Sequence, residues 1–254
     1  MKQSAIAERQ FGGTAAAYLS SSVHASGADL EAVAALTARH AGAEVLDLGC
    51  GAGHLSFAAA PHARSVTAFD LSENMLQVVT TAARGRNLGN IVTVPGAAEA
   101  LPFDDARFDI VATRFSAHHW SDVPAALREA HRVLKPGGTL VVIDIVAPEN
   151  PLFDTVLQTV ELLRDASHVR DYRVSEWEAM LAGAGFAQRC EGRWPLRMAF
   201  DDWIARMRTP AERVAAIRSV FAAAAEEVRG AFALEADGSF VIEAARFEAV
   251  RQDS

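Results

Sequence analysis

A glycine-rich loop preceded by an aspartate is the part of the sequence whose residue types and spacing point most directly to chemistry. Val45–Leu55 reads VLDLGCGAGHL, so a short apolar run leads into Gly49, Gly51 and Gly53. Glycines allow a sharp backbone turn and a close approach of a ligand. Asp47 stands two residues before the first glycine. A carboxylate there repels a diphosphate and favours a ligand that carries an ammonium group.

A second aspartate sharpens the identity of that ligand. Asp70 ends the next apolar run, 21 residues after Gly49, where a carboxylate can accept hydrogen bonds from both ribose hydroxyls of an adenosine. The alternative is that Asp70 caps the following helix, although Ser72 could do so by itself. Together with Asp47, and with GxGxG in place of GxGxxG, Asp70 favours S-adenosylmethionine (SAM) over NAD.

Two adjacent histidines are the candidate catalytic residues. His118 and His119 lie in the segment FSAHHW after the fourth apolar run, Ile110–Thr113. In an open α/β sheet, ligands bind outside the carboxyl ends of the strands, so this segment is expected over the sulfonium of SAM. A histidine with a pKa near 6.5 can act as a base at neutral pH. The alternative is that one or both only fix the loop. Transfer of the methyl group from a sulfonium would need no metal, and no metal-ligand spacing is strong enough to propose a metal site.

A charged cluster, RDASHVRD at 164–171, is the candidate acceptor site. Arg164 and His168 share a face if the preceding helix continues. We expect an anionic or hydrogen-bonding acceptor to meet Arg164, His168 and Arg170. Dense charge of this kind is also typical of a solvated surface or an internal salt-bridge network.

Alternating strands and helices must position these residues. Continuous apolar runs separated by helical segments predict a parallel sheet covered on both faces. The predicted strands are Val45–Leu48, Val66–Phe69, Ile91–Val94, Ile110–Thr113 and Leu140–Val146. The predicted helices are Asp29–His40, Gly53–Ala59, Glu73–Arg84 and Val123–Leu134, the last closed by a turn at KPGG (135–138).

The pattern changes after Pro148. Helices are predicted over Leu152–Asp165, Ser175–Gly183 (with Ser175 and Glu178 as a capping box) and Asp201–Gly230, with a break at Pro210. Phe186–Leu196 and Phe240–Val250 are strand candidates. We interpret residues 1–254 as one domain, with a helical cover at 1–40 and helical additions at 148–175 and 200–232.

Composition narrows the function classes. The 254 residues carry a net charge of −8, and the arginines are dispersed, which disfavours binding to nucleic acid. Two cysteines, Cys50 and Cys190, indicate reduced thiols rather than a disulfide scaffold. No segment resembles a signal peptide or a membrane span. We therefore expect a cytoplasmic enzyme, monomeric or homodimeric, that acts on a small molecule.

Four successive motifs carry a family resemblance. VLDLGCGAG, VTAFDLSENML, GAAEALPFDDARFDIV and RVLKPGGTLVVID resemble the motifs of class I SAM-dependent methyltransferases, most closely the ubiquinone/menaquinone-biosynthesis branch. The resemblance covers roughly residues 11–146. It implies a Rossmann-like seven-stranded sheet of order 3-2-1-4-5-7-6 with an antiparallel seventh strand, and helical additions that form a lid.

The resemblance also implies residue roles. Asp47, Gly49, Cys50 and Gly51 would line the methionine end, and Asp70 the ribose. The remaining implied cofactor residues are Leu71, Met75, Ala97, Ala98, Glu99 and Arg114, together with Tyr18 in a helix that closes over SAM. Ala97 departs from the family, which often has Asp there, so a hydrogen bond to the adenine amino group is absent. Ser22, His24 and the RDxSHxR pattern resemble an uncharacterised bacterial subgroup, which makes His24 a further substrate candidate.

The sequence thus predicts a methyltransferase that forms S-adenosylhomocysteine (SAH) as its product. Three alternatives stay open: a SAM-binding protein without catalysis, a nicotinamide-dependent oxidoreductase, and a methyltransferase that acts on nucleic acid or protein.

Overall fold

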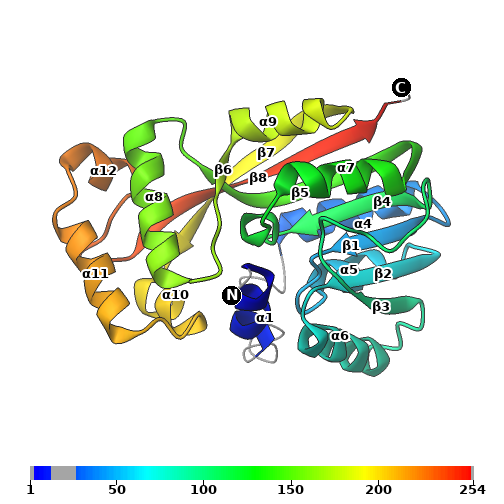
Figure 1. Cartoon of the computed structure of the whole chain (residues 1–254), viewed down its shortest axis with the longest axis horizontal. Helices are drawn as coiled ribbons and strands as arrows, with labels where there is room; N and C mark the ends of the chain where they lie inside the picture. The colour runs from blue at the N-terminus through cyan, green and yellow to red at the C-terminus, as the bar shows by residue number, and fades with distance from the viewer. Residues whose placement is uncertain (1–2, 13–26, 253–254) are drawn as a thin grey trace.

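The computed structural model describes residues 3–12 and 27–252. Within these ranges, seven strands form a sheet in the order β3-β2-β1-β4-β5-β8-β7, and the short β6 pairs with β5 (Figure 1). The strands are β1 (Glu44–Leu48), β2 (Ser65–Asp70), β3 (Ile91–Pro95), β4 (Phe108–Arg114), β5 (Leu134–Ala147), β6 (Tyr172–Arg173), β7 (Phe186–Met198) and β8 (Phe240–Arg251).

The predicted sheet order is confirmed. β3, β2, β1, β4 and β5 run parallel, and β8 is antiparallel to both β5 and β7. If the two-residue β6 is left aside, this is the order 3-2-1-4-5-7-6 with an antiparallel last strand. Because the parallel strands share one carboxyl edge, the ends of β1, β2 and β4 lie side by side there.

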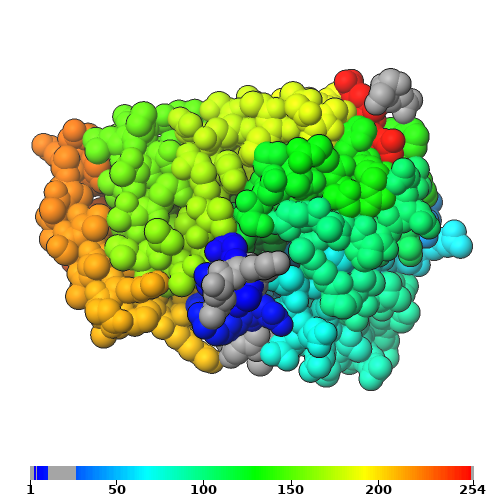
Figure 2. Space-filling view, viewed as in Figure 1, coloured from blue at the N-terminus to red at the C-terminus, as the bar shows by residue number. Residues whose placement is uncertain are grey.

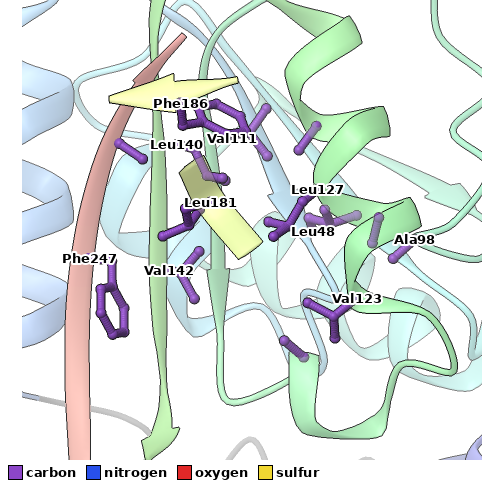
Figure 3. Packing of buried hydrophobic residues seen from close by; sticks show 14 of the residues in the cluster. Leu48, Ala98, Val111, Val123, Leu127, Leu140, Val142, Leu181, Phe186 and Phe247 are labelled. Carbon is purple, nitrogen blue, oxygen red and sulfur yellow. The ribbon is translucent and has the colours of Figure 1, made fainter. Parts of the chain in front are cut away.

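Helices cover both faces of the sheet, as continuous apolar strands require. On one face, α4 (Ala28–Arg39) and α5 (His54–Ala59) pack on Val45 of β1 and Ile110 of β4. On the other, α7 (Val123–Val133) and α9 (Val174–Gly183) pack on Leu48 and Phe247. Figure 3 shows Leu48, Val111, Leu127 and Leu181 meeting in this second layer.

A local cap fixes the helix after β2. The hydroxyl oxygen of Ser72 accepts a hydrogen bond from the Met75 amide at 3.4 Å, at the start of α6 (Glu73–Gly85). Ser72 therefore acts as the N-cap, which leaves the Asp70 carboxylate for other contacts.

The chain after β5 builds a second lobe. Helices α8 (Pro151–Arg164), α10 (Phe200–Arg206), α11 (Ala211–Ala222) and α12 (Glu226–Ala231) surround the far ends of β7 and β8 (Figure 1). Leu157, Trp203, Phe221 and Phe240 belong to its apolar core. Helix α1 (Gln3–Gly12) lies between the two lobes (Figure 2).

Three local predictions were wrong. Asp201–Gly230 forms three short helices instead of two. The KPGG segment belongs to β5, which starts at Leu134 directly after α7. The predicted capping box, Ser175 with Glu178, lies two residues too late: Glu176 accepts a hydrogen bond from the Arg173 amide at 2.8 Å, while the Ser175 hydroxyl donates to Glu149.

In the part of the chain that the structure describes, no helix is both long and apolar enough to cross a membrane.

Candidate active site

The glycine loop leaves room for a ligand at the end of β1. Gly51 has a φ of +50°, and a Cβ atom added to it would meet no atom within 4 Å among those described. At Gly49, with a φ of +74°, an added Cβ would instead lie 2.0 Å from the Ser116 hydroxyl. Both positions require glycine, the first for access and the second for packing.

The two aspartates hold the loop from either side. Asp70 accepts hydrogen bonds from the amides of Gly51 and Ser72, each at 2.8 Å. One oxygen of Asp47 accepts hydrogen bonds from the amide and hydroxyl of Ser56 at 2.9 and 2.6 Å. Burial raises the pKa of both carboxyls. For Asp47, burial and the charge of Asp70 together raise the pKa to about 7.

A cavity of about 1170 Å³, its open mouth included, lies over this loop. It brings together every predicted cofactor residue that the structure describes; the predicted Tyr18, Ser22 and His24 fall outside the described residues. The predicted residues in its wall are Asp47, Gly49, Cys50, Gly51, Asp70, Leu71, Met75, Ala97, Ala98, Glu99 and Arg114.

The lining fits a cationic adenosyl amino acid. At one end the charge of Asp70 contributes to the raised pKa of Asp47, a repulsion that a positively charged ligand relieves. Leu71, Met75 and Ala98 offer apolar surface to a flat ring. Ala97 lines the cavity with a side chain that has no hydrogen-bonding group.

Two of the predicted residues also have structural partners. The guanidinium of Arg114 forms an ion pair with the buried carboxylate of Asp29 on α4. Glu99 accepts hydrogen bonds from the amide and hydroxyl of Ser121 at 2.9 and 2.7 Å, and so ties together the loops after β3 and β4.

Sequence reasoning predicted a helical cover at 1–40 but did not name the residues of α1 that line this cavity. Gln3, Ala7 and Glu8 line it, and the Gln3 amide donates to the Ser167 carbonyl at 2.6 Å. Nothing in the composition of Gln3–Gly12 signals this role, because the helix packs on residues that are distant in sequence.

The predicted histidine pair lies directly after β4, and its two members have different environments. The Nδ1 atom of His118 is 2.6 Å from a carboxylate oxygen of Asp144, which is buried in β5. Burial lowers the pKa of His118, but the Asp144 carboxylate outweighs it and raises the pKa to about 9. His118 is therefore protonated at neutral pH.

His119 is neutral at the same pH. Burial and the charge of His118, whose ring centroid is 4.1 Å away, lower its pKa to about 4. Its Nδ1 atom lies 3.2 Å from the Ser167 carbonyl oxygen. Since a carbonyl only accepts, Nδ1 carries the proton and Nε2 the lone pair.

A second cavity of about 670 Å³ adjoins the first. Phe115 and His119 line both cavities. Phe115 has a φ of +52°, in the left-handed region. Such strain costs on the order of 1–3 kcal/mol and is typical of functional sites.

Of the predicted acceptor residues that the structure describes, Arg164 alone lines a cavity. Arg164 lines the second cavity, donates to the Trp203 carbonyl at 3.0 Å and pairs with Glu161 at 3.2 Å. His168 is buried and is absent from the lining of both cavities; its ring is tilted by 37° against that of His118 at a centroid distance of 5.9 Å. Arg170 is not in the lining of either cavity and pairs with Asp154 and Glu176. Its contact with an acceptor stays a prediction, and these ion pairs count against it.

The comparisons with known proteins identify the family of the chain. A family described as a methyltransferase domain matches residues 46–142. The chain is 50% identical over 186 residues to the uncharacterized protein YafE of Escherichia coli (strain K12), which covers 73% of this chain and 90% of that protein. It is 37% identical over 227 residues to the uncharacterized methyltransferase YcgJ of Bacillus subtilis (strain 168), covering 89% and 90%.

A crystal structure of YcgJ from Bacillus superposes with a TM-score of 0.83 at 35% identity, over 88% of this chain and 100% of that one. A demethylmenaquinone methyltransferase of Staphylococcus epidermidis is 41% identical over 118 residues, 45% of this chain and 48% of that protein. The chain belongs to the class I SAM-dependent methyltransferases. Its likeness to the menaquinone enzyme is limited to about half of each protein.

Proposed function

We propose that the chain binds SAM in the first cavity and transfers its methyl group to a small molecule in the second. One observation carries this proposal: the two cavities adjoin, and Phe115 and His119 line both. SAM, when bound, supplies an electrophilic methyl group on a good leaving group. What the protein must add is alignment of the two reactants and exclusion of water.

Asp47 and Asp70 bind the cofactor in the proposed site. Their carboxylates favour an ammonium group and ribose hydroxyls and disfavour a diphosphate. The strained backbone of Phe115 keeps its side chain at the junction of the cavities, because its amide donates to the Ile143 carbonyl at 2.8 Å.

His119 acts on the acceptor. As a neutral ring with its Nδ1 proton directed to Ser167, it offers an Nε2 lone pair to a donor group of the acceptor and takes its proton when the acceptor is one that must lose it. Burial is the main cause that keeps His119 neutral, and the positive charge of His118 adds to it, so His118 acts through its neighbour.

Binding and turnover test this proposal separately. Calorimetric titration with SAM, SAH and NAD should give binding of the first two alone; binding of NAD alone would refute the cofactor assignment. Turnover is measured as methylated product by mass spectrometry, with a panel of phenolic, amine and carboxylate acceptors.

The alternative of a SAM-binding protein without catalysis has one supporting feature, the absent hydrogen bond at Ala97. A Kd for SAM in the usual range together with no product from any acceptor would favour it. Product that disappears in His119→Gln, while SAH binding persists, would exclude it.

A further inference from the structure

The second cavity has an apolar wall and a polar wall. The apolar wall comes from β5, β7, β8 and the segment around α10, with Ile145, Leu196, Met198, Trp203, Met207 and Ile242. The polar wall comes from the histidine loop, α8 and the residues that follow it. A ligand that fills this cavity therefore has an apolar body and a polar end.

The described lining of this cavity holds as many carboxylates as cations. The carboxylates are Glu161, Asp165 and Asp171, all buried, and the cations are His118, Arg164 and Arg206; a fourth buried carboxylate, Asp144, contacts His118 without lining the cavity. His119 and His168 add no charge, since burial lowers the pKa of each to about 4.

Three of the four carboxylates have strong partners. Asp144 pairs with His118 at 2.6 Å and Glu161 with Arg164 at 3.2 Å. Asp165 accepts hydrogen bonds from the amide and hydroxyl of Ser167, each at 2.7 Å.

Asp171 differs from these three. It is 2% exposed and lines the cavity, yet its Oδ2 atom makes no hydrogen bond within the described part of the chain. The Nε2 atom of His168, whose ring is neutral, lies 3.9 Å from this Oδ2 atom. Burial, together with the charge of Glu161, raises the pKa of Asp171 well above its usual range.

The position of Asp171 is nevertheless fixed. The side chain of Gln158 accepts a hydrogen bond from the Asp171 amide at 3.1 Å and donates one to its carbonyl at 2.8 Å. A buried carboxyl that is held by its backbone and lacks a partner carries a large desolvation cost unless a ligand supplies one.

We propose that the second cavity recognises an acceptor with an apolar body and one positively charged nitrogen, and that Asp171 is the counter-ion of this nitrogen. This inference rests on the proposed function, because it names the substrate class of that site. An anionic ligand would be repelled by the ionised form of Asp171 and would leave its Oδ2 atom without a partner. A neutral hydroxyl could bond to Asp171 but would supply no charge to balance the ionised carboxylate. Recognition by Asp171 is independent of which acceptor atom is methylated.

Three matched probes test the charge preference: 2-phenylethylammonium, 2-phenylethanol and 3-phenylpropionate. Their affinities for the complex of the protein with SAH are measured by ligand-observed NMR at pH 7. We expect the ammonium compound to bind at least about tenfold more tightly than the alcohol, and the carboxylate most weakly.

Two isosteric variants test the residue. Asp171→Asn should remove the preference for the ammonium probe. Asp201→Asn removes a carboxylate that is 91% exposed on α10 and should keep the preference. The affinity for SAH should be unchanged in both variants, which also reports that they fold.

The outcomes separate the two proposals. Failure of the wild-type protein to bind SAH would refute the proposed function. Normal SAH binding with no preference for the ammonium probe, including no binding of any probe, would overturn the inference about Asp171. So would a preference that survives in Asp171→Asn.

Discussion

Replacement of Asp47 by asparagine should stabilise the free protein and abolish its binding of SAM. Burial raises the pKa of Asp47 from 3.8 to about 7 in the folded protein. The unfolded chain therefore ionises this group at lower pH than the folded one. The free energy of unfolding is therefore not reduced by Asp47 below pH 3.8, where the carboxyl is neutral in both states. It falls as the pH rises from 3.8 to about 7, because ionisation is easier in the unfolded chain.

The size of this effect follows from the two pKa values. At 1.36 kcal/mol per pKa unit, the lost stability is on the order of 1–2 kcal/mol at pH 5 and about 4 kcal/mol at pH 8. Asparagine keeps an oxygen for the amide and hydroxyl of Ser56 and cannot ionise. The gain in unfolding free energy of Asp47→Asn should therefore grow with pH by about 2–3 kcal/mol between pH 5 and pH 8.

Urea unfolding of both proteins at pH 5 and pH 8 measures this difference, with Asp201→Asn as the control that should show no such trend. A gain that is equal at both pH values, or a loss at pH 8, would refute the assignment of a buried, protonated Asp47.

Binding of SAM should depend on the same proton. A cationic ligand favours the ionised carboxylate, so Asp47 must release its proton before or during binding. With a pKa of about 7, the Kd should weaken about fivefold from pH 7 to pH 6, and proton release should approach one per SAM at pH 6. Calorimetry in buffers of different ionisation enthalpy counts the protons. A Kd that is independent of pH would contradict this account.

Three further predictions concern the histidine loop and the second lobe. His119→Gln should lower the rate of methyl transfer about 10²–10⁴-fold with little change in the Kd for SAH, measured by product formation and calorimetry. Asp144→Asn should bring the pKa of His118 down from about 9 towards or below 6.5, as followed by NMR titration, and should lower stability most below pH 6.5, with the loss fading as the pH rises through 9. The hydrogen bond from Arg173 lowers the pKa of Glu176 to about 2, so the contribution of Glu176 to the free energy of unfolding is present above pH 4.5 and is lost as the pH falls through 2. Because both side chains of the pair are about 30% exposed, we expect Glu176→Gln to lower the free energy of unfolding by less than about 1 kcal/mol at pH 7, as measured by denaturant unfolding.

The cofactor half of the site could be predicted because its signals are local. Asp47, Gly51 and Asp70 lie within or next to strand ends, and a parallel sheet brings such ends to one edge. The same reasoning placed the loop after β4 over that edge. The positions of these residues at the edge of the sheet depend on the order and direction of the strands. The alternation of apolar runs with helical segments already predicts a parallel sheet.

The acceptor half could not be predicted because its contacts join distant elements. Arg170 forms ion pairs with Asp154 on α8 and Glu176 on α9. The positive charge that the sequence pattern assigned to an anion site is therefore neutralised by carboxylates from other elements. One signal was available: Asp144 is the only charged residue between Leu140 and Ala147. A lone carboxylate in a buried strand requires a partner.

His118 and His119 show why residue type alone could not assign roles at this site. The two residues are adjacent and of the same type, yet the pKa of His118 is about 9 and that of His119 is about 4. Asp144 contacts only the first ring, and the charge that it stabilises there lowers the pKa of the second. One carboxylate in β5 thus fixes a cation whose charge adds to burial in keeping the neighbouring ring neutral. Asp144 by itself raises the pKa of His119, but by less than the charge of His118 lowers it, so removal of the Asp144 charge should raise the pKa of His119 as it lowers that of His118. Opposite shifts in a single NMR titration would establish this coupling, and parallel shifts would exclude it.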